Sequence, residues 1–444
     1  MSKSSVLTKS DLVLVFALAK AGLGHFRVTD ALYRGLPSGA ALLLGTQDDT
    51  IEWLHRFVTV HPITRAIGEW IQRGWPQDIF TYFYRDSLRH HTETLYNQML
   101  TILDQRVEQP KRMLVVATHF ALAHQMAAIK RKLMLKRGIE VILVVVVTDD
   151  SPQHLWAVSG ADMTVVPSAR TRNALRQYHE SQRMAPTTWV VAPYPVSLKL
   201  GEHLHASRWE VRQEQANPVS HTQIQVVIPI AGAAVQLDYF EKLVSLLSAE
   251  ERLHFWIVSK QGPPTRMFLE KMLGRIRVSL VTSPHDRDVV RLYEQLYAKE
   301  VIMLEVTKPS EQAFKALIEP KRVGGSILLF SDPVGRQEHD NIQFLRRHNL
   351  IPDKDVQVSL WHLAFSGKHL AEATRQIAEE LSGWRGLRLP EGAEESATFI
   401  RWCLREGIFA KMLEFRGYQN HSELSADGVK VFWEKVAEYL SQRI

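Results

Sequence analysis

The chain has 444 residues, of which 45% are hydrophobic, and this length exceeds the size at which one core usually stops growing, so we expect two folded domains. Its longest apolar runs, residues 12–19 and 141–147, are too short to span a bilayer, and with Cys403 as the single cysteine an internal disulfide is excluded, so we expect a cytoplasmic protein. The net charge of +6 is uneven, because residues 1–200 hold 23 Lys and Arg against 16 Asp and Glu. An acidic partner is therefore expected to meet the first half of the chain.

Residues 1–200 alternate apolar runs with stretches of helical spacing. The expected strands are residues 11–19, 40–45, 112–118, 140–148, 163–167 and 187–192. Several are β-branched at successive positions, which is typical of parallel strands buried on both faces. We therefore predict an α/β, Rossmann-like, doubly wound domain over residues 1–200.

A glycine turn follows the first expected strand. Gly22 and Gly24 flank one residue, and His25 comes next, at the expected start of a helix. Glycines let the backbone approach a ligand closely, and an imidazole there is a candidate general base near neutral pH. The alternative is an ordinary glycine turn with no catalytic role.

Two further polar sites follow expected strands in this domain. Asp149 comes directly after the most apolar strand, where it would orient His25 or an acceptor hydroxyl, or else form an ordinary turn. His119 is a candidate at the end of the expected strand 112–118, and its spacing of five from His124 places the two on different helix faces. We therefore predict no metal site.

Aromatic and basic residues alternate between residues 53 and 89. Trp70, Trp75 and Phe80 are the aromatics expected to face a membrane, and Arg73 and Arg85 lie near them. This mixture suits a membrane surface, where rings enter the interface and arginines meet phosphate. It also suits a buried aromatic core with solvated arginines, or a surface for single-stranded nucleic acid.

The chain becomes polar over residues 201–223, which we interpret as a linker, and a second α/β succession occupies residues 224–369. Its expected strands are residues 224–230, 254–259, 277–282, 301–307, 326–331 and 356–360. Residues 370–444 have a helical pattern, interrupted around residues 383–392, and would pack back across both domains. The two halves predict two doubly wound domains that face a cleft.

Polar side chains gather after two strands of the second domain. Lys308 follows one strand, and Gln337, Glu338 and Asn341 follow the next, so the two loops should be neighbours. Lysine would offset the charge of a diphosphate, and the amide and carboxylate oxygens would accept hydrogen bonds from a sugar. Gly232, after the first strand, leaves room for a phosphate or nucleobase. The alternative is a plain strand-loop-helix unit with an acidic first turn.

Taken in order, these motifs resemble glycosyltransferases of the two-domain GT-B architecture, in the branch of the monogalactosyldiacylglycerol synthases, diacylglycerol glucosyltransferases and peptidoglycan N-acetylglucosaminyltransferase. Residues 22–25 resemble its Gly-x-Gly-His loop, and Thr148-Asp149 with His154 and Trp156 resembles its Thr-Asp…His-x-x-Trp pattern. Lys308 resembles its Thr-Lys loop, and residues 337–341 its Gln-Glu-x-x-Asn motif.

The resemblance implies metal-independent, inverting transfer of a sugar from a nucleotide diphosphate donor to a lipid or lipid-like hydroxyl, with no cofactor and no nucleic acid. It makes His25 the candidate base, places Gly22, Gly24, His119 and His154 on the acceptor side, and assigns the donor to the second domain.

The chain departs from that family after Lys308, where Pro309-Ser310-Glu311 replaces a glycine-rich turn and Lys315 lies near the position of a glutamate that holds the donor ribose. Two alternatives follow: a protein of this fold that binds a nucleotide or partner without turnover, and a nucleotide-sugar 2-epimerase-like enzyme.

Overall fold

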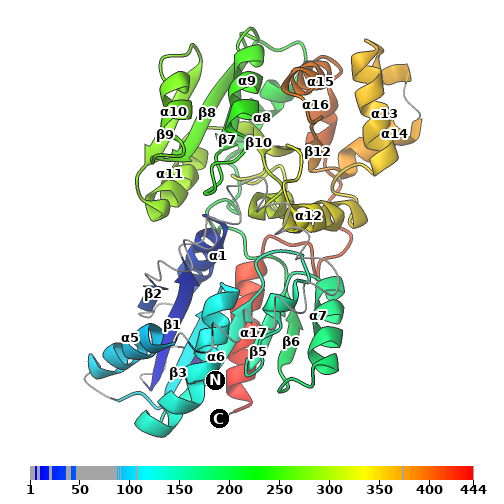
Figure 1. Cartoon of the computed structure of the whole chain (residues 1–444). Coiled ribbons are helices and arrows are strands. Elements are labelled where there is room, and N and C mark those ends of the chain that lie inside the picture. Colours follow the sequence, from blue (N-terminus) through cyan, green and yellow to red (C-terminus); the bar gives the residue numbers. More distant parts are fainter. Residues whose placement is uncertain are drawn as a thin grey trace. The chain divides into compact units, whose positions relative to one another are not determined.

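The computed structural model describes residues 6–7, 11–19, 23–36, 42–46, 88, 90, 92–106, 109–372 and 375–443. Gly22, Trp70, Trp75 and Phe80 lie outside the described residues. The chain divides into two compact units, Met1–Pro195 with His421–Ile444, and Val196–Asn420 (Figure 1). Within the described ranges no helix has the length and apolarity needed to cross a membrane.

The first unit is built on a six-stranded parallel sheet in the order β2-β1-β3-β4-β5-β6. The strands are β1 (Leu12–Ala19), β2 (Leu42–Thr46), β3 (Arg112–Ala117), β4 (Glu140–Val146), β5 (Met163–Val166) and β6 (Thr188–Val191). The six expected strands are thus confirmed. The chain runs outward from β1 to β2 and then in the opposite direction from β3 to β6, so the strand order reverses between β1 and β3.

Helices cover this sheet, and their ends follow local sequence. In the described ranges these helices are α1 (Leu23–Arg34), α5 (Glu93–Asp104), α6 (Phe120–Arg137), the 3₁₀ turn η2 (His154–Trp156), α7 (Ala169–Ser181) and α17 (Gly428–Ser441). The His119 side chain caps α6, which ends at Gly138 with a left-handed φ of 64°. Ser168 caps α7 by accepting from the amide of Thr171. Each side-chain cap satisfies an amide that the helix itself leaves unpaired.

The last helix returns to the first unit, whereas the chain from Val196 up to Asn420 belongs to the second unit. Figure 1 shows α17, in red, among the blue and cyan elements of this unit. Its Trp433 indole donates to the carbonyl oxygen of Leu32 in α1 at 2.9 Å. Gly428 packs so closely on the backbone that an added Cβ would lie 2.3 Å from the carbonyl oxygen of Pro193. The ends of the chain are therefore joined in one core.

The second unit has its own six-stranded parallel sheet, in the order β12-β11-β10-β7-β8-β9. The strands are β7 (Ile224–Pro229), β8 (Leu253–Lys260), β9 (Val278–Ser283), β10 (Ile302–Thr307), β11 (Ile327–Phe330) and β12 (Gly386–Arg388). Here the order reverses between β7 and β10. Two Rossmann-like, doubly wound α/β units are therefore confirmed.

One expected strand is wrong. Residues 356–360 lie within the helix α13 (Lys354–Phe365), whose buried side chains are Gln357, Leu360, Leu363 and Ala364. These positions recur at intervals of one, three and four, which is helical spacing, so a short alternation of apolar and polar residues misled the strand assignment. The sixth strand is β12, three residues long, in the region expected as an interruption between helices.

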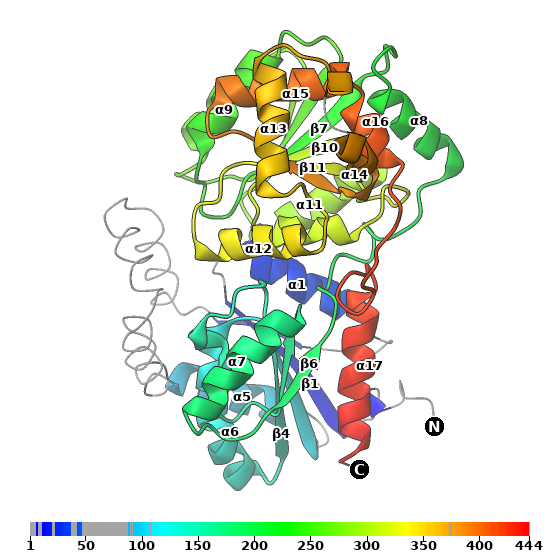
Figure 2. The same ribbon diagram turned by 90° about the vertical axis from the view of Figure 1, so that its right-hand side faces the viewer.

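The remaining helices of this unit pack on its sheet, and Figure 2 shows α13 and α15 in front of β7, β10 and β11. They are α8 (Ala206–Ala216), α9 (Leu237–Leu247), α10 (Arg266–Met272), α11 (Asp286–Lys299), η3 (Glu311–Leu317), α12 (Arg336–Arg347), η4 (Leu370–Glu372), α14 (Arg375–Glu380), η5 (Leu381–Gly383), α15 (Ala393–Arg405) and α16 (Ile408–Leu413). Residues 201–223, expected as a linker, contain α8, whose Arg212, Gln215 and Ala216 are buried. Cys403 lies in the core, as expected, and burial raises the pKa of its thiol.

Candidate functional sites in the two units

The first candidate site lies where the strand order of the first sheet reverses. His25 is in the first turn of α1, after β1, and its Nδ1 lies 2.8 Å from the carbonyl oxygen of Thr118, after β3. A carbonyl oxygen only accepts, so this Nδ1 carries the hydrogen and Nε2 is the nitrogen that takes up a proton. The Thr148 hydroxyl, after β4, lies 3.3 Å from the same Nδ1. Three strand ends thus orient one imidazole.

A second contact ties α1 to β3 one turn further on. The Thr29 hydroxyl donates to the carbonyl oxygen of His25 at 2.8 Å. Because that hydroxyl has one hydrogen, it accepts from the Thr118 hydroxyl, whose oxygen is 2.8 Å away. The sequence analysis missed Thr29 and Thr118, and the available signal was the position of Thr118 directly after a buried strand.

His119 and His154 are both held by neighbouring groups. The His119 ring meets the His25 ring edge to face, with centroids 4.8 Å apart, and its Nδ1 accepts from the Ala121 amide at 3.3 Å. His154 stacks on Tyr178 of α7 with ring centroids 3.6 Å apart. The structure therefore brings His119 to His25 and places His154 against α7.

The two aspartates after β4 differ in their surroundings. Asp149 is half-buried and directly follows Thr148, whereas Asp150 is fully buried. Asp150 accepts from the Thr171 hydroxyl at 2.8 Å and from the Ser168 hydroxyl, so it stabilises the start of α7. From the same loop, the Thr148 hydroxyl contacts the His25 imidazole.

The second candidate site joins the loops after β10 and β11. Lys308 Nζ lies 2.5 Å from Glu338 Oε1, and the two side chains are 10% and 11% exposed. The other oxygen, Oε2, accepts from the amide of Val334 at 2.7 Å. The Asn341 amide donates to the carbonyl oxygens of Pro309 and Ser310 at 3.2 and 3.3 Å. The expected neighbourhood of Lys308 with the Gln-Glu-x-x-Asn segment is confirmed.

Gln337 and Gly335 lie at the exposed start of α12. Gln337 is exposed on the first turn, and the backbone of the helix cap Gly335 is extended, with φ −173°. A Cβ added at Gly335 would meet no atom of the described residues within 4 Å. The start of α12 therefore has open space beside it and amides that face outward from the helix.

The loop after β7 is held to the loop after β11. Gly232 is exposed within it, and the non-glycine residues Ala234 and Gln236 have left-handed φ values of 50° and 62°. Gln236 accepts from the Ser331 hydroxyl at 2.8 Å and donates to the carbonyl oxygen of Asp332 at 3.0 Å. Left-handed non-glycine residues cost energy and gather at functional sites. This strained loop lies where the order of the second sheet reverses.

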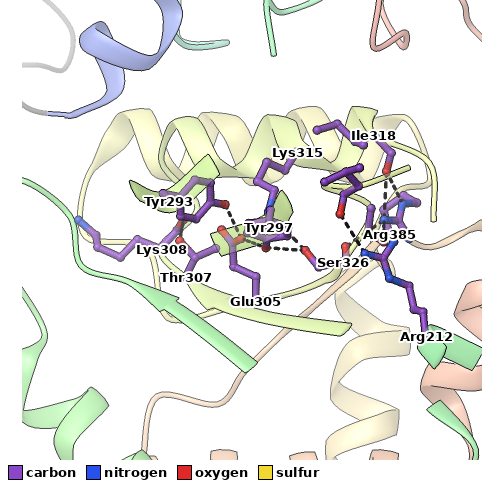
Figure 3. A network of polar contacts seen from close by, with 12 residues as sticks. Arg212, Tyr293, Tyr297, Glu305, Thr307, Lys308, Lys315, Ile318, Ser326 and Arg385 are labelled. Carbon is purple, nitrogen blue, oxygen red and sulfur yellow. Dashed lines mark hydrogen bonds and ion pairs between the residues drawn. The ribbon is translucent and has the colours of Figure 1, made fainter. Parts of the chain in front are cut away.

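Lys315, near the position expected to meet a donor ribose, points into the interior instead (Figure 3). It is 4% exposed, pairs with Glu305 of β10 and donates to the Tyr297 hydroxyl at 2.6 Å. The hydroxyls of Tyr293 and Tyr297 donate to the same carboxylate oxygen at 2.6 and 2.5 Å. Burial, and then Glu305, raise the pKa of Tyr297 well above its usual value. This cluster ties η3 to β10 and α11.

Two buried arginines hold the following loop. Arg212 donates to the carbonyl oxygens of Pro320, Arg322 and Val323 at 2.5 to 2.9 Å. Arg385 donates to those of Ile318, Gly325 and Ser326 at 2.9 to 3.3 Å. Burial lowers the pKa of Arg212 to about 9 and also lowers the pKa of Arg385. Both guanidiniums thus act on backbone oxygens (Figure 3).

Over the part of the chain that the structure describes, no group of three or more His, Cys, Asp or Glu is placed to hold a metal ion.

No protein-family model matches the chain, and no curated protein sequence matches it. Solved structures similar to it include a UDP-GlcNAc 2-epimerase from Neisseria meningitidis bound to UDP-GlcNAc, with 10% identity, 96% of this chain and 99% of that chain covered, and a TM-score of 0.47. MurG from Acinetobacter baumannii matches with 10% identity, coverage of 97% and 98%, and a TM-score of 0.46. Likeness at these levels identifies no activity.

Proposed function

We propose that this protein is an inverting glycosyltransferase that moves a sugar from a nucleoside diphosphate to an acceptor hydroxyl. The observation that carries the proposal is the orientation of His25 by the Thr118 carbonyl oxygen, which leaves Nε2 to act as a base. The proposal assigns the donor to the second unit and the acceptor to the first.

The proposed reaction needs one base and one site for a leaving anion. His25 Nε2 takes the proton of the acceptor hydroxyl, whose oxygen forms a bond to the anomeric carbon of the sugar. The bond from that carbon to the diphosphate breaks on the opposite face, and the nucleoside diphosphate leaves with the electron pair. Lys308 and the amides at the start of α12 would meet its negative charge.

The leaving-group assignment is supported by the open space beside Gly335. A helix start offers amides and a positive dipole end, and the first turn of α12 carries Glu338, whose side chain pairs with Lys308. Gln337, exposed on the first turn, would accept hydrogen bonds from sugar hydroxyls.

Thermal stabilisation by uridine, guanosine, thymidine and adenosine diphosphate sugars tests the donor site, because a ligand that binds only the folded state raises the melting temperature. We expect a shift with at least one donor that is lost in Lys308→Met. His25→Asn should keep that shift and lower transfer by 100-fold or more, since general-base catalysis typically contributes that much. Wild-type transfer rates in both variants would refute these roles.

A binding protein without turnover is the second candidate, and the inward turn of Lys315 favours it. The residue at this position supplies no carboxylate for a ribose, so donor contacts there would be fewer than in the family that the motifs resemble. This candidate predicts a thermal shift with a nucleotide and no sugar transfer to any acceptor.

We also propose a lipid or lipid-like acceptor at an anionic membrane surface, supported by the positive charge of residues 1–200. In the described part of this unit, exposed Leu135 lies among exposed Arg131, Lys132 and Lys136 at the end of α6. That end lies at the amino edge of the sheet, so it would tether the protein and would not deliver an acceptor to His25. Flotation with anionic vesicles tests the tether, and loss of flotation in Lys132→Glu/Lys136→Glu is expected. No flotation of the wild type at low salt would exclude membrane binding.

A further inference from the structure

The Lys308–Glu338 pair is built as a closed unit. Both oxygens of Glu338 are engaged from within the chain, one by Lys308 Nζ at 2.5 Å and one by the Val334 amide at 2.7 Å. The two side chains are 10% and 11% exposed. A carboxylate fixed in this way orients the lysine, and it also remains beside any anion that the lysine meets.

The charges of this pair make the carboxylate a competitor of incoming anions. Little water screens charges that are about nine-tenths buried, so an anion bound at Lys308 feels the attraction of the ammonium and the repulsion of the carboxylate together. An anion with a single phosphate gains little at such a site. A diphosphate brings more charge and reaches a second group of donors, the amides at the start of α12.

Figure 3 shows that Lys308 points away from the cluster of Glu305 and Lys315. In that cluster Glu305 accepts from Lys315 and both tyrosines. Lys308, by contrast, has Glu338 as its ion-pair partner at the carboxyl edge of the sheet. Lys315 therefore has a structural role in the buried cluster. Lys308 lies at the carboxyl edge of the sheet, and the carboxylate of Glu338 offsets its charge.

We infer that Glu338 is the counterion of Lys308 and makes the site discriminate a diphosphate from a monophosphate, rather than serving mainly as a contact for the donor sugar. This inference rests on the proposed function only in placing the diphosphate at Lys308. Removing the negative charge of Glu338 while keeping its shape should therefore strengthen anion binding and reduce that discrimination.

Inorganic pyrophosphate and inorganic phosphate are suitable probes, because they carry the anionic charge without a base or a sugar. Calorimetric titration of the full chain should show pyrophosphate binding to the wild type. Glu338→Gln keeps an oxygen that accepts from the Val334 amide, and this variant should bind pyrophosphate about tenfold more tightly. Its affinity for phosphate should rise by a larger factor, because a single phosphate depends on Lys308, whereas pyrophosphate also reaches the amides at the start of α12. Lys308→Met should lose binding in both backgrounds.

Glu250→Gln is the matched control. This variant removes the same charge from the ion pair between Glu250 and Arg401, whose atoms are 2.8 Å apart. Glu250 lies next to the start of β8, so this pair is at the opposite edge of the sheet. Its affinities should match those of the wild type. Melting curves of each variant establish that it is folded, and Glu338→Ala provides a second removal of the charge.

Each outcome decides between the two proposals. If Glu338→Gln and Glu338→Ala bind pyrophosphate no more tightly than the wild type while Lys308→Met loses it, the counterion role is wrong and the donor site stands. If both Glu338 variants instead lose binding of the sugar nucleotide but keep that of pyrophosphate, Glu338 is a sugar contact. If Lys308→Met binds pyrophosphate and sugar nucleotides as the wild type does, or if no variant binds either, the donor site and the inference both fail.

Discussion

Replacing Lys315 by methionine tests whether its buried ion pair with Glu305 of β10 stabilises the second unit. Glu305 is fully buried, and the substitution would leave its charge with two tyrosine hydroxyls as the remaining partners. Removing one partner of a buried pair costs about 3–5 kcal/mol, because the charge that remains is uncompensated. For a unit of this size, we expect a fall in melting temperature of roughly 6–20 °C.

The double variant Lys315→Met/Glu305→Leu separates the pair from its parts. Replacing both charges with apolar groups of similar volume is often close to neutral, although Tyr293 would then lose its acceptor. We therefore expect the double variant to be at least about 2 kcal/mol more stable than the sum of the single losses predicts. Urea unfolding followed by tryptophan fluorescence measures all three variants. Additive losses, or a single loss below about 1 kcal/mol, would refute the reasoning.

Three further predictions concern other contacts. Gly428→Ala should release α17, because its Cβ would lie 2.3 Å from the Pro193 carbonyl oxygen; limited proteolysis should then cut the last helix, and an unchanged digest would contradict this packing. Trp433→Phe should cost about 1–3 kcal/mol, since it leaves the Leu32 carbonyl oxygen without its donor; urea midpoints measure this, and no change would count against it. Burial raises the pKa of Tyr239 to about 12, so between pH 10 and 12 the unfolded chain loses this proton first and the free energy of unfolding falls as pH rises. In Tyr239→Phe this fall should be smaller by up to about 2.7 kcal/mol. If the free energy of unfolding has the same pH dependence in both proteins, another group titrates.

The strands could be predicted where a run of β-branched residues is long enough to distinguish a strand from a helix. Residues 140–148 form such a run, and β4 lies there. Residues 356–360 alternate apolar and polar side chains as a strand would, but their burial follows the helical face of α13. The three residues of β12 carry no period of their own, and pairing with β11 decides their conformation. Short segments therefore depend on tertiary partners that the local sequence does not contain.

The candidate sites could be predicted to the level of neighbouring loops. Lys308 and Glu338 follow adjacent parallel strands, and a shared sheet edge brings such positions together. The inward turn of Lys315 was beyond prediction, since it depends on Glu305 in β10 and two tyrosines in α11. The orientation of His25 likewise depends on the backbone carbonyl oxygen of Thr118. Every residue has such an oxygen, so the sequence does not indicate which one the imidazole meets. Side-chain direction, unlike strand order, was set by distant partners.

The return of α17 to the first unit has a consequence for how the protein is made. Residues 1–195 leave the ribosome before the roughly 225 residues of the second unit and before the helix that covers α1. At bacterial or eukaryotic rates of about 5–20 residues per second, the early part waits roughly 10–50 s for its last element. During that time the apolar face that later meets Trp433 stays uncovered. The second unit, which is continuous in sequence, is therefore able to complete its fold before the first.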